Sequence, residues 1–392
     1  MNLLFLFIGA AVGWCAWGGT SNIAPLLFIL VLPFIWGLTK TRVNAAALIG
    51  GYFLAGARGL PAGAVIFFGD ATSPLLGWSM WCFSNALLTM PFVCLWHSEG
   101  GQKVWSFPIA SVICALPPLA IIGWLNPVSV SGVMYPNLGL FGLLLTFGVM
   151  SALVARNIKL LALLLVVTFF ANLGMSRSSP PPTGWRGVDT SFSRLSSDGI
   201  DDAGQLLASM RRVQWVANFV RSIQKGEVVV LPETIVGAFD GFASSSLRQA
   251  EVDLAARGAR LLVGAEIPIA DGRYDNALLV LGARHGEDRA AIQGIPVPVG
   301  MWKPWTESGA AAHFLTNKSE VDVNGIRAGV AICYEQVLAF SLLRIGLTRP
   351  DVLLAVSNIW WAKSTNIPLI QLQSVRAFSR LFGIPVIVAR NS

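Results

Sequence analysis

The sequence predicts a multi-span α-helical membrane domain followed by an α/β domain. The chain has a mean hydropathy of +0.63 and 12% charged residues, about half the charged fraction of a typical soluble protein. This apolar excess is confined to roughly residues 1–175. From about residue 188 to 392, short apolar runs alternate with amphipathic segments, which indicates strands between helices. Residues 176–187 contain three consecutive prolines, Pro180–Pro182, and predict a stiff linker between the two domains.

The first domain holds seven candidate membrane spans, because a span needs about 20 mostly apolar residues. They cover roughly residues 2–18, 22–39, 43–68, 75–96, 105–125, 137–154 and 158–174. The first segment lacks a basic region before its apolar run, so we expect a retained anchor and not a cleaved signal peptide.

Lysine and arginine in the loops predict the orientation of the spans. Five cations lie in the loops Lys40–Arg42, 97–103 and Arg156–Lys159. Because cytoplasmic loops are enriched in such residues, we expect a cytoplasmic N-terminus, a bacterial inner-membrane location and a periplasmic C-terminal domain. Arg58 lies inside the third span. It is either a functional intramembrane charge or an arginine that extends to the membrane interface.

Composition also excludes several kinds of site. Residues 1–177 carry seven cations and two anions, so most of the net charge of +7 is a topology signal, and we predict no nucleic-acid binding. Four of the five cysteines lie in apolar segments, which predicts no disulfide framework. The histidines, His97, His285 and His313, pair with no Cys or carboxylate at ligand spacing, so we predict no metal site and no cofactor.

The second domain is predicted to contain a sheet that is covered on both faces, because its strands are continuously apolar. The predicted strands are 227–231, 260–265, 276–281, 327–332, 351–356 and 384–389, and the predicted helices are 201–224, 244–257 and 366–382.

Polar residues follow three of these strands directly. Glu233, Cys333 and Ser357-Asn358 stand where an α/β sheet usually places its functional groups. Cys333 is the single cysteine of the C-terminal half and is a candidate nucleophile; the alternative is a buried structural cysteine. Glu233 is a candidate general base, and the alternative is a helix cap or a solvated loop residue.

Three short motifs carry a resemblance to a known family. Leu231-Pro-Glu-Thr234, Ile332-Cys-Tyr-Glu335 and Ser357-Asn-Ile-Trp-Trp361 resemble the nitrilase superfamily. Together with the membrane segments, including Ile122-Gly-Trp-Leu-Asn-Pro127 and Leu138-Gly-Leu-Phe-Gly142, they resemble the apolipoprotein N-acyltransferases. A plasmid-encoded family of conjugal transfer proteins with the same two-part layout is more similar still. The resemblance covers most of the chain.

The resemblance implies an α-β-β-α sandwich with a Glu-Lys-Cys triad and a thioester intermediate. Glu233 would take the proton of Cys333, so we expect the two side chains within proton-transfer reach. Lys303 and the backbone N–H of Tyr334 would stabilise the oxyanion. Glu335 and Glu307 match further acidic positions of the family, and Tyr274-Asp-Asn276 matches a segment with a structural role.

Two features depart from the family pattern. The run Pro304-Trp-Thr-Glu307 places Val299 where the family has its lysine. Lys303 would then act after a local shift in register, or else it is a loop lysine beside two tryptophans. The chain also ends at Ser392, where the acyltransferases continue into further strands and a last helix. We therefore expect an exposed sheet edge that a protein partner or a second copy of the chain covers.

These observations predict a membrane-anchored protein that performs acyl transfer or amide hydrolysis through Cys333. The resemblance alone implies that it serves plasmid conjugation. The resemblance implies a phospholipid acyl donor from the surrounding bilayer and an amine acceptor. The alternatives are a non-catalytic membrane component of the transfer or envelope machinery, which uses the fold as a docking surface, and an anchored amidase with a soluble substrate.

Overall fold

The computed structural model describes residues 2–69, 73–98, 100–175, 180–192, 202–269, 272–283 and 288–392. Within it the chain divides into two compact units. The helical unit comprises residues 1–179, 336–347 and 361–384, and the α/β unit comprises residues 180–335, 348–360 and 385–392. The domains predicted from the sequence are consecutive, whereas two late segments pack with the helical unit. His285 and residues 176–179 of the predicted linker lie outside the described residues.

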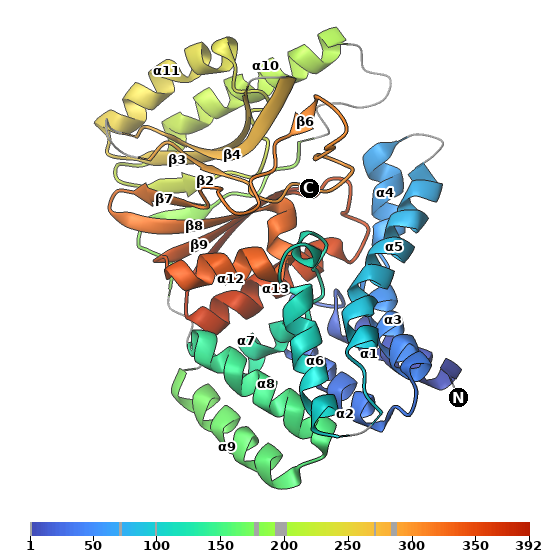
Figure 1. The fold of residues 1–392 in the computed structure, drawn as a ribbon. Helices are drawn as coiled ribbons and strands as arrows, with labels where there is room; N and C mark the ends of the chain where they lie inside the picture. The colour runs from blue at the N-terminus through green and yellow to red at the C-terminus, as the bar shows by residue number, and fades with distance from the viewer. Residues whose placement is uncertain are drawn as a thin grey trace. The chain divides into compact units, whose positions relative to one another are not determined.

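The helical unit contains most of the apolar segments as helices (Figure 1). Its helices are α1 (Asn2–Ala16), η1 (Ala24–Leu30), α2 (Val31–Leu38), α3 (Arg42–Gly56), α4 (Leu60–Phe68), α5 (Ser73–Cys94), α6 (Gly101–Cys114), η2 (Leu119–Ile121), η3 (Pro127–Val130), α7 (Ser131–Met134), α8 (Gly139–Ala155), α9 (Ile158–Met175), α12 (Ala339–Thr348) and α13 (Ile367–Phe382).

In the described part of the chain, no single helix combines the length and hydropathy of a membrane span. Two pairs of consecutive helices, each bent at a short break, have that length and hydropathy when taken together. Residues Arg42–Gly56 and Leu60–Phe68 meet at 45°, and Pro127–Met134 and Gly139–Ala155 meet at 113°. The predicted span 43–68 is therefore bent, and the helix within the predicted span 105–125 already ends at Cys114.

Helices α1 and α3 pack closely because glycines line their contact. A Cβ atom on Gly9 would lie 1.8 Å from the carbonyl oxygen of Leu48, and one on Gly51 would lie 2.3 Å from that of Leu6. Small residues of this kind let helix backbones approach each other directly.

Arg58, just beyond the end of α3, has structural partners. Its Nη1 donates to the carbonyl oxygens of Trp17 and Ala55, each at 3.1 Å. Its guanidinium lies 4.0 Å from the centroid of the Trp14 ring. These contacts join the ends of α1 and α3 and favour a packing role for this arginine.

Helix α13 is tied to the N-terminal helices by buried polar side chains. Gln373 accepts a hydrogen bond from the Gly18 N–H at 2.7 Å and donates to the carbonyl oxygen of Asn22 at 3.0 Å. Asn366 donates to the carbonyl oxygen of Gly56 at 2.9 Å. A side-chain amide satisfies helix-end groups that would otherwise be unpaired, which explains why α13 belongs to the helical unit.

The α/β unit contains two sheets. Sheet A has the strand order β1 (Trp185–Gly187), β2 (Val228–Val230), β3 (Arg260–Pro268), β4 (Arg273–Leu281), β5 (Ala290–Ile292), with β6 (Gly309–Ala310) also paired to β4. Sheet B has the order β10 (Val386–Asn391), β9 (Val352–Asn358), β8 (Ile326–Ile332), β7 (Glu320–Val323). Neighbours are parallel in β1-β2-β3 and β10-β9-β8, and antiparallel in β3-β4-β5 and β7-β8.

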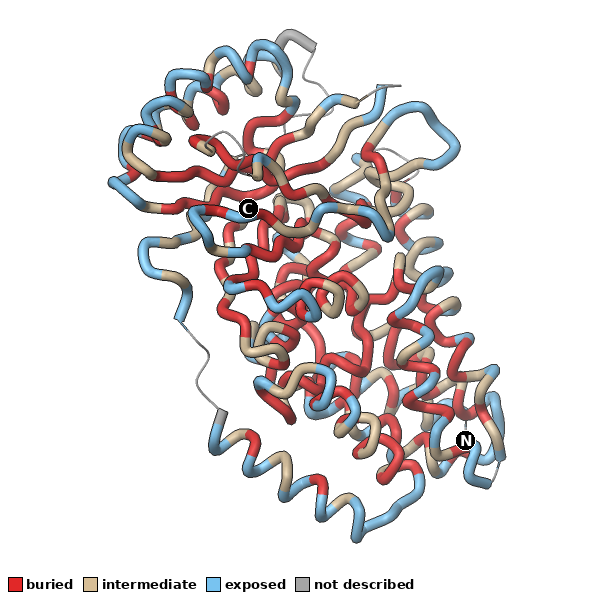
Figure 2. The backbone as a smooth tube through the Cα atoms, turned by 60° about the vertical axis from the view of Figure 1, so that its left-hand side comes forward, coloured by how far each residue is buried: buried red, intermediate tan, exposed pale blue. Residues whose placement is uncertain are grey.

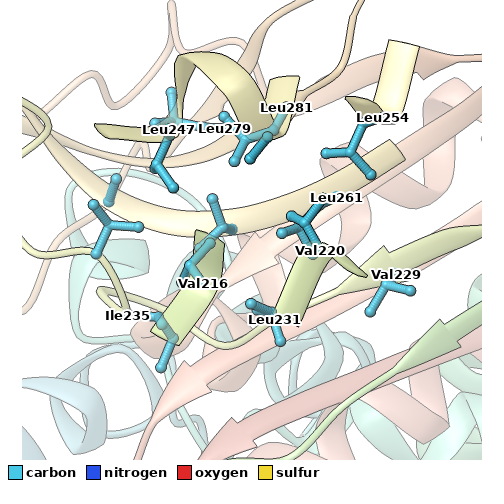
Figure 3. Close-up of a cluster of buried hydrophobic side chains, with 14 of the residues drawn as sticks. Val216, Val220, Val229, Leu231, Ile235, Leu247, Leu254, Leu261, Leu279 and Leu281 are labelled. Atoms are coloured by element: carbon cyan, nitrogen blue, oxygen red, sulfur yellow. The ribbon is translucent and has the colours of Figure 1, made fainter. Parts of the chain in front are cut away.

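Alternate residues of sheet A face opposite cores, as the period of a strand requires. Val229 and Leu261 pack against helices α10 (Asp202–Phe219) and α11 (Gly241–Ala256) (Figure 3). Val228 and Leu262 pack against sheet B, whose Val330 belongs to the same buried cluster. Sheet A is thus buried on both faces, as predicted, and the strands of this unit are largely buried in Figure 2.

The edge of sheet B at β10 is partly covered by the chain itself. The Thr190 N–H donates to the carbonyl oxygen of Arg390 at 2.9 Å, and the Ser392 N–H donates to that of Thr190 at 3.0 Å. The side chain of Asn391 accepts from the Phe192 N–H at 2.7 Å. The expectation of an exposed edge is therefore wrong at its carboxyl end, because a segment before α10 returns to it.

Candidate active site

Glu233 stands on a tight turn directly after strand β2. The next residue, Thr234, has φ +56°, a left-handed conformation that is uncommon outside glycine. Gly264 of β3 lies against this turn, and a Cβ atom there would come within 2.4 Å of the Pro232 carbonyl oxygen and the Thr234 nitrogen. Only glycine fits at this position, so β3 fixes the backbone that carries Glu233.

The carboxylate of Glu233 is buried, with 3% of the residue exposed, and receives hydrogen bonds from other strands. Its Oε1 accepts from Asn276 Nδ2 of β4 at 2.7 Å, and its Oε2 accepts from the backbone N–H of Asn358 in β9 at 2.9 Å. The thiol of Cys333 also hydrogen bonds to it. The two sheets therefore converge on one carboxylate.

Cys333 follows β8 at the start of the short helix η6 (Cys333–Val337). Its φ is +47°, which costs a non-glycine residue about 1–2 kcal/mol, and a sharp strand-to-helix turn of this kind is typical of nucleophilic residues. The backbone N–H groups of Tyr334 and Asn358 hydrogen bond to its sulfur. The structure thus brings Glu233 and Cys333 into direct contact, as the proposed chemistry requires.

Burial sets the protonation of this pair. It raises the pKa of the Glu233 carboxyl, while the hydrogen bonds from Asn276, Cys333 and the Asn358 N–H oppose that rise. Burial, followed by the charge of Glu233, raises the pKa of the Cys333 thiol well above its ordinary value. The thiol therefore keeps its proton at neutral pH and lies beside a group that can accept it.

A buried amide network supports the pair. Asn276 Nδ2 also donates to Gln293 Oε1 at 2.9 Å, and Gln293 Nε2 donates to the carbonyl oxygen of Ile332 at 2.9 Å. On the other side, Asn391 Nδ2 donates to Asn358 Oδ1 at 2.9 Å. Sequence reasoning missed Gln293 and Asn391. Each is a polar residue at the end of an apolar strand, and that position is the sequence signal that could have identified them.

Glu335, predicted as a secondary acid, is 3% exposed and binds backbone groups. Its Oε1 accepts from the N–H groups of Gly294 at 2.9 Å and Ile295 at 3.3 Å, and its Oε2 accepts from the Ile332 N–H at 3.1 Å. These hydrogen bonds connect the segment after β5 to the end of β8. The geometry favours a role in holding the Cys333 turn.

Lys303 and Glu307 lie on the loop between β5 and β6. The Lys303 carbonyl oxygen accepts from the Thr306 N–H at 3.0 Å, and Glu307 is exposed. Among the residues that the structure describes, no hydrogen bond or ion pair joins the Lys303 ammonium group to Glu233 or Cys333. Val299 has φ +66° in the turn that precedes Lys303. The role of Lys303 stays a prediction.

A second carboxyl group, Glu266, was also missed. The β3–β4 register pairs it with Asn276, so both side chains project from the same face of sheet A. Burial, with a smaller contribution from the charge of Glu233, raises the pKa of Glu266 to about 7. Within the described ranges, no three His, Cys, Asp or Glu side chains gather as metal ligands.

Comparison with known proteins extends the resemblance seen in the motifs. The chain is 31% identical over 409 residues to the conjugal transfer protein TraB of Agrobacterium fabrum, covering 99% of this chain and 92% of the relative. It is 24% identical over 203 residues to apolipoprotein N-acyltransferase of Haemophilus ducreyi, covering 47% of this chain and 39% of that protein.

Among solved structures, a mutant of a Nesterenkonia amidase from the nitrilase superfamily matches 54% of this chain and 79% of its own, with a TM-score of 0.36 and 13% identity. No family model matches the chain. The full-length similarity is decisive: the chain belongs to the family of TraB conjugal transfer proteins.

Proposed function

We propose that this protein is a membrane-anchored enzyme that transfers or hydrolyses acyl groups through a thioester on Cys333, in the service of conjugal plasmid transfer. The observation that carries the proposal is the buried hydrogen bond between the Cys333 thiol and the Glu233 carboxylate. The biological setting is inferred from relatives named as conjugal transfer proteins.

The first half-reaction forms the thioester. The Glu233 carboxylate takes the proton from Cys333 as the sulfur bonds to the carbonyl carbon of the acyl donor, and the carbonyl electron pair moves to its oxygen. The oxyanion then collapses, the bond to the leaving group breaks, and Glu233 returns the proton to that group. Because the pKa of the resting thiol is high, proton removal must accompany the attack.

The second half-reaction releases the acyl group. Water or an amine attacks the thioester carbonyl and gives its proton to Glu233. The carbon–sulfur bond then breaks, and the departing sulfur takes the proton back from Glu233. The cycle restores the thiol and the carboxylate, and needs neither an oxidant nor a reductant.

Backbone N–H groups are the oxyanion donors at hand. The Tyr334 N–H hydrogen bonds to the sulfur and so lies next to the carbon that the sulfur would attack. The Asn358 N–H also hydrogen bonds to the sulfur, but it donates to Glu233 Oε2 as well. Loss of one such donor typically costs about 10²–10³ in rate. Lys303 would add a positive charge if its loop moves toward the thiol when substrate binds.

Exposed apolar side chains support membrane anchoring of the helical unit. On α9 these include Ile158, Leu163, Phe169, Phe170 and Leu173, each more than half exposed, and Figure 2 shows much of α9 exposed. Helices α1 and α5 expose Leu3, Phe7, Leu75 and Phe83 in the same way. Soluble proteins rarely expose apolar patches of this extent. With the cations in the predicted cytoplasmic loops, this supports an inner-membrane protein with a periplasmic α/β unit. The phospholipid acyl donor is proposed from the family resemblance alone.

One observation favours the second candidate function, a non-catalytic docking component of the transfer or envelope machinery. In the described residues, no hydrogen bond or ion pair joins the ammonium group of Lys303 to the Glu233–Cys333 pair, although the related enzymes would use a lysine there. A site that has lost its cation would retain the fold as a binding surface.

The two functions are separated by plasmid transfer frequency with Cys333→Ala at equal membrane expression. The proposed enzyme predicts a loss of transfer by Cys333→Ala and also by Glu233→Gln, whereas the matched control Cys15→Ser, in α1, transfers as wild type. Wild-type transfer by both Cys333→Ala and Glu233→Gln would support the docking function and overturn the enzymatic one.

A further inference from the structure

Strand β3 places Glu266 beside Asn276, one of the residues that hydrogen bond to Glu233. Glu266 is the direct cross-strand neighbour of Asn276, and such pairs have Cβ atoms about 4.5–5.5 Å apart on one face of the sheet. The backbone of Glu266 is fixed by the segment 237–239, because its N–H donates to the Gly237 carbonyl oxygen at 2.8 Å and its own carbonyl oxygen accepts from the Phe239 N–H at 2.7 Å.

Asn276 has one buried atom without a partner. Its Nδ2 donates to both Glu233 and Gln293, while its Oδ1 is buried and accepts no hydrogen bond from any residue that the structure describes. Buried amide oxygens are normally paired. A protonated carboxyl group has an O–H to donate, and an ionised one is an acceptor only. Glu266 is the cross-strand neighbour that can complete this amide, and it can do so only with its proton.

We propose that Glu266 is a positioning residue of the Glu233–Cys333 pair: its protonated carboxyl group donates a hydrogen bond to Asn276 Oδ1, so that the amide holds Glu233 toward the thiol. The inference rests on the proposed thiol chemistry and adds to it. It also assigns a neutral acid to a site where the related enzymes use a cation.

The surrounding charges favour this state. The charge of Glu233 raises the pKa of Glu266, of Tyr274 on β4 and of the Cys333 thiol, and the charge of Glu266 also raises the pKa of Tyr274. An ionised Glu266 would add a second negative charge next to Glu233 and oppose formation of a thiolate. The raised pKa of Glu266, about 7, places this change near neutral pH.

The test is the alkylation rate of Cys333 by iodoacetamide from pH 5.5 to 9, measured on the full-length protein in detergent by mass spectrometry of the Cys333 peptide. Above pH 7, the wild-type rate rises less steeply than for an isolated thiol. Glu266→Gln keeps an N–H donor for Asn276 and stays neutral at every pH. Its alkylation rate should match that of wild type at pH 6 and exceed it about tenfold at pH 8.5, which corresponds to a shift of about one unit in the pKa of the thiol.

Glu266→Leu has the volume but no donor, and reacts more slowly than Glu266→Gln at every pH. Identical pH profiles for wild type and Glu266→Gln, or identical rates for Glu266→Gln and Glu266→Leu, would overturn the inference. Alkylation does not need an acyl substrate. A failure of thioester formation would therefore sink the proposed function while the alkylation profile still decides the role of Glu266.

Discussion

Gly264→Ala tests whether the position of Glu233 is set by the backbone of strand β3. The new Cβ atom would lie 2.4 Å from the Pro232 carbonyl oxygen and from the Thr234 nitrogen, and 2.5 Å from the Cα of Glu233. Ordinary contacts begin near 3.4 Å, so the turn must retreat by about 1 Å. All three atoms belong to the backbone, and no side-chain rotation can relieve the overlap.

The expected effect has two parts. Overpacking of this kind costs about 1–3 kcal/mol of unfolding free energy. A displacement of about 1 Å at a reacting group costs about 10²-fold in rate, because Glu233 would move away from Cys333. Both quantities are measurable on one preparation. Urea unfolding of the α/β unit gives the unfolding free energy, and a thioester probe gives the rate of Cys333 acylation.

Gly241→Ala is the matched control, since a Cβ atom there would have no described atom within 4 Å. It should leave the rate and the stability as in wild type. A folded Gly264→Ala protein that acylates Cys333 at the wild-type rate would refute the claim that β3 positions Glu233.

Three further substitutions test the groups around the pair. Glu266 has a folded pKa of about 7 against an ordinary value of 4.5, so the stability that its proton contributes is complete below pH 4.5 and is lost as the pH rises through 7. As the pH rises from 4.5 to 8, the free energy of unfolding of Glu266→Gln should therefore increase relative to that of wild type by at most about 3 kcal/mol. Parallel pH–stability curves from urea unfolding would contradict this. Asn391→Leu leaves the partly buried Asn358 side chain and the Phe192 N–H without their Asn391 partner, which should cost about 1–3 kcal/mol by the same measurement; an unchanged midpoint would count against the network. Glu335→Gln replaces one acceptor oxygen by a donor that faces backbone N–H groups, with a similar expected loss of about 1–3 kcal/mol, and a variant as stable as wild type would remove its assigned role.

The sequence indicates most of the helices and the main strands because their signals are local, whereas α12 (Ala339–Thr348) was not predicted. Apolar runs mark the helical unit, and β2, β3, β4, β8, β9 and β10 follow from continuous apolar stretches. Strands β1, β5, β6 and β7 have two to four residues each, too few to show a period, and they lack the longer apolar run that marks the equally short β2. The packing of α13 rests on bonds such as that between Gln373 and Gly18, which lie far apart in the sequence and leave no local pattern.

The candidate site divides in the same way. Glu233 and Cys333 were predictable because each directly follows an apolar strand and belongs to a recognisable motif. Gln293, Asn391 and Glu266 were not, because their roles depend on strand register and on which face of a sheet they occupy. The role predicted for Lys303 rested on motif alignment alone, and its loop makes no hydrogen bond or ion pair from the lysine to the pair in the described parts of the chain.

The most direct measurement of the central claim is mass spectrometry of the Cys333 peptide after the full-length protein in membranes is incubated with an acyl donor. Proton transfer from Cys333 to Glu233 predicts a hydroxylamine-labile acyl adduct on this cysteine in wild type and its loss in Glu233→Gln. An adduct formed equally well by Glu233→Gln, or no adduct on wild-type Cys333 in protein that supports plasmid transfer, would contradict the account.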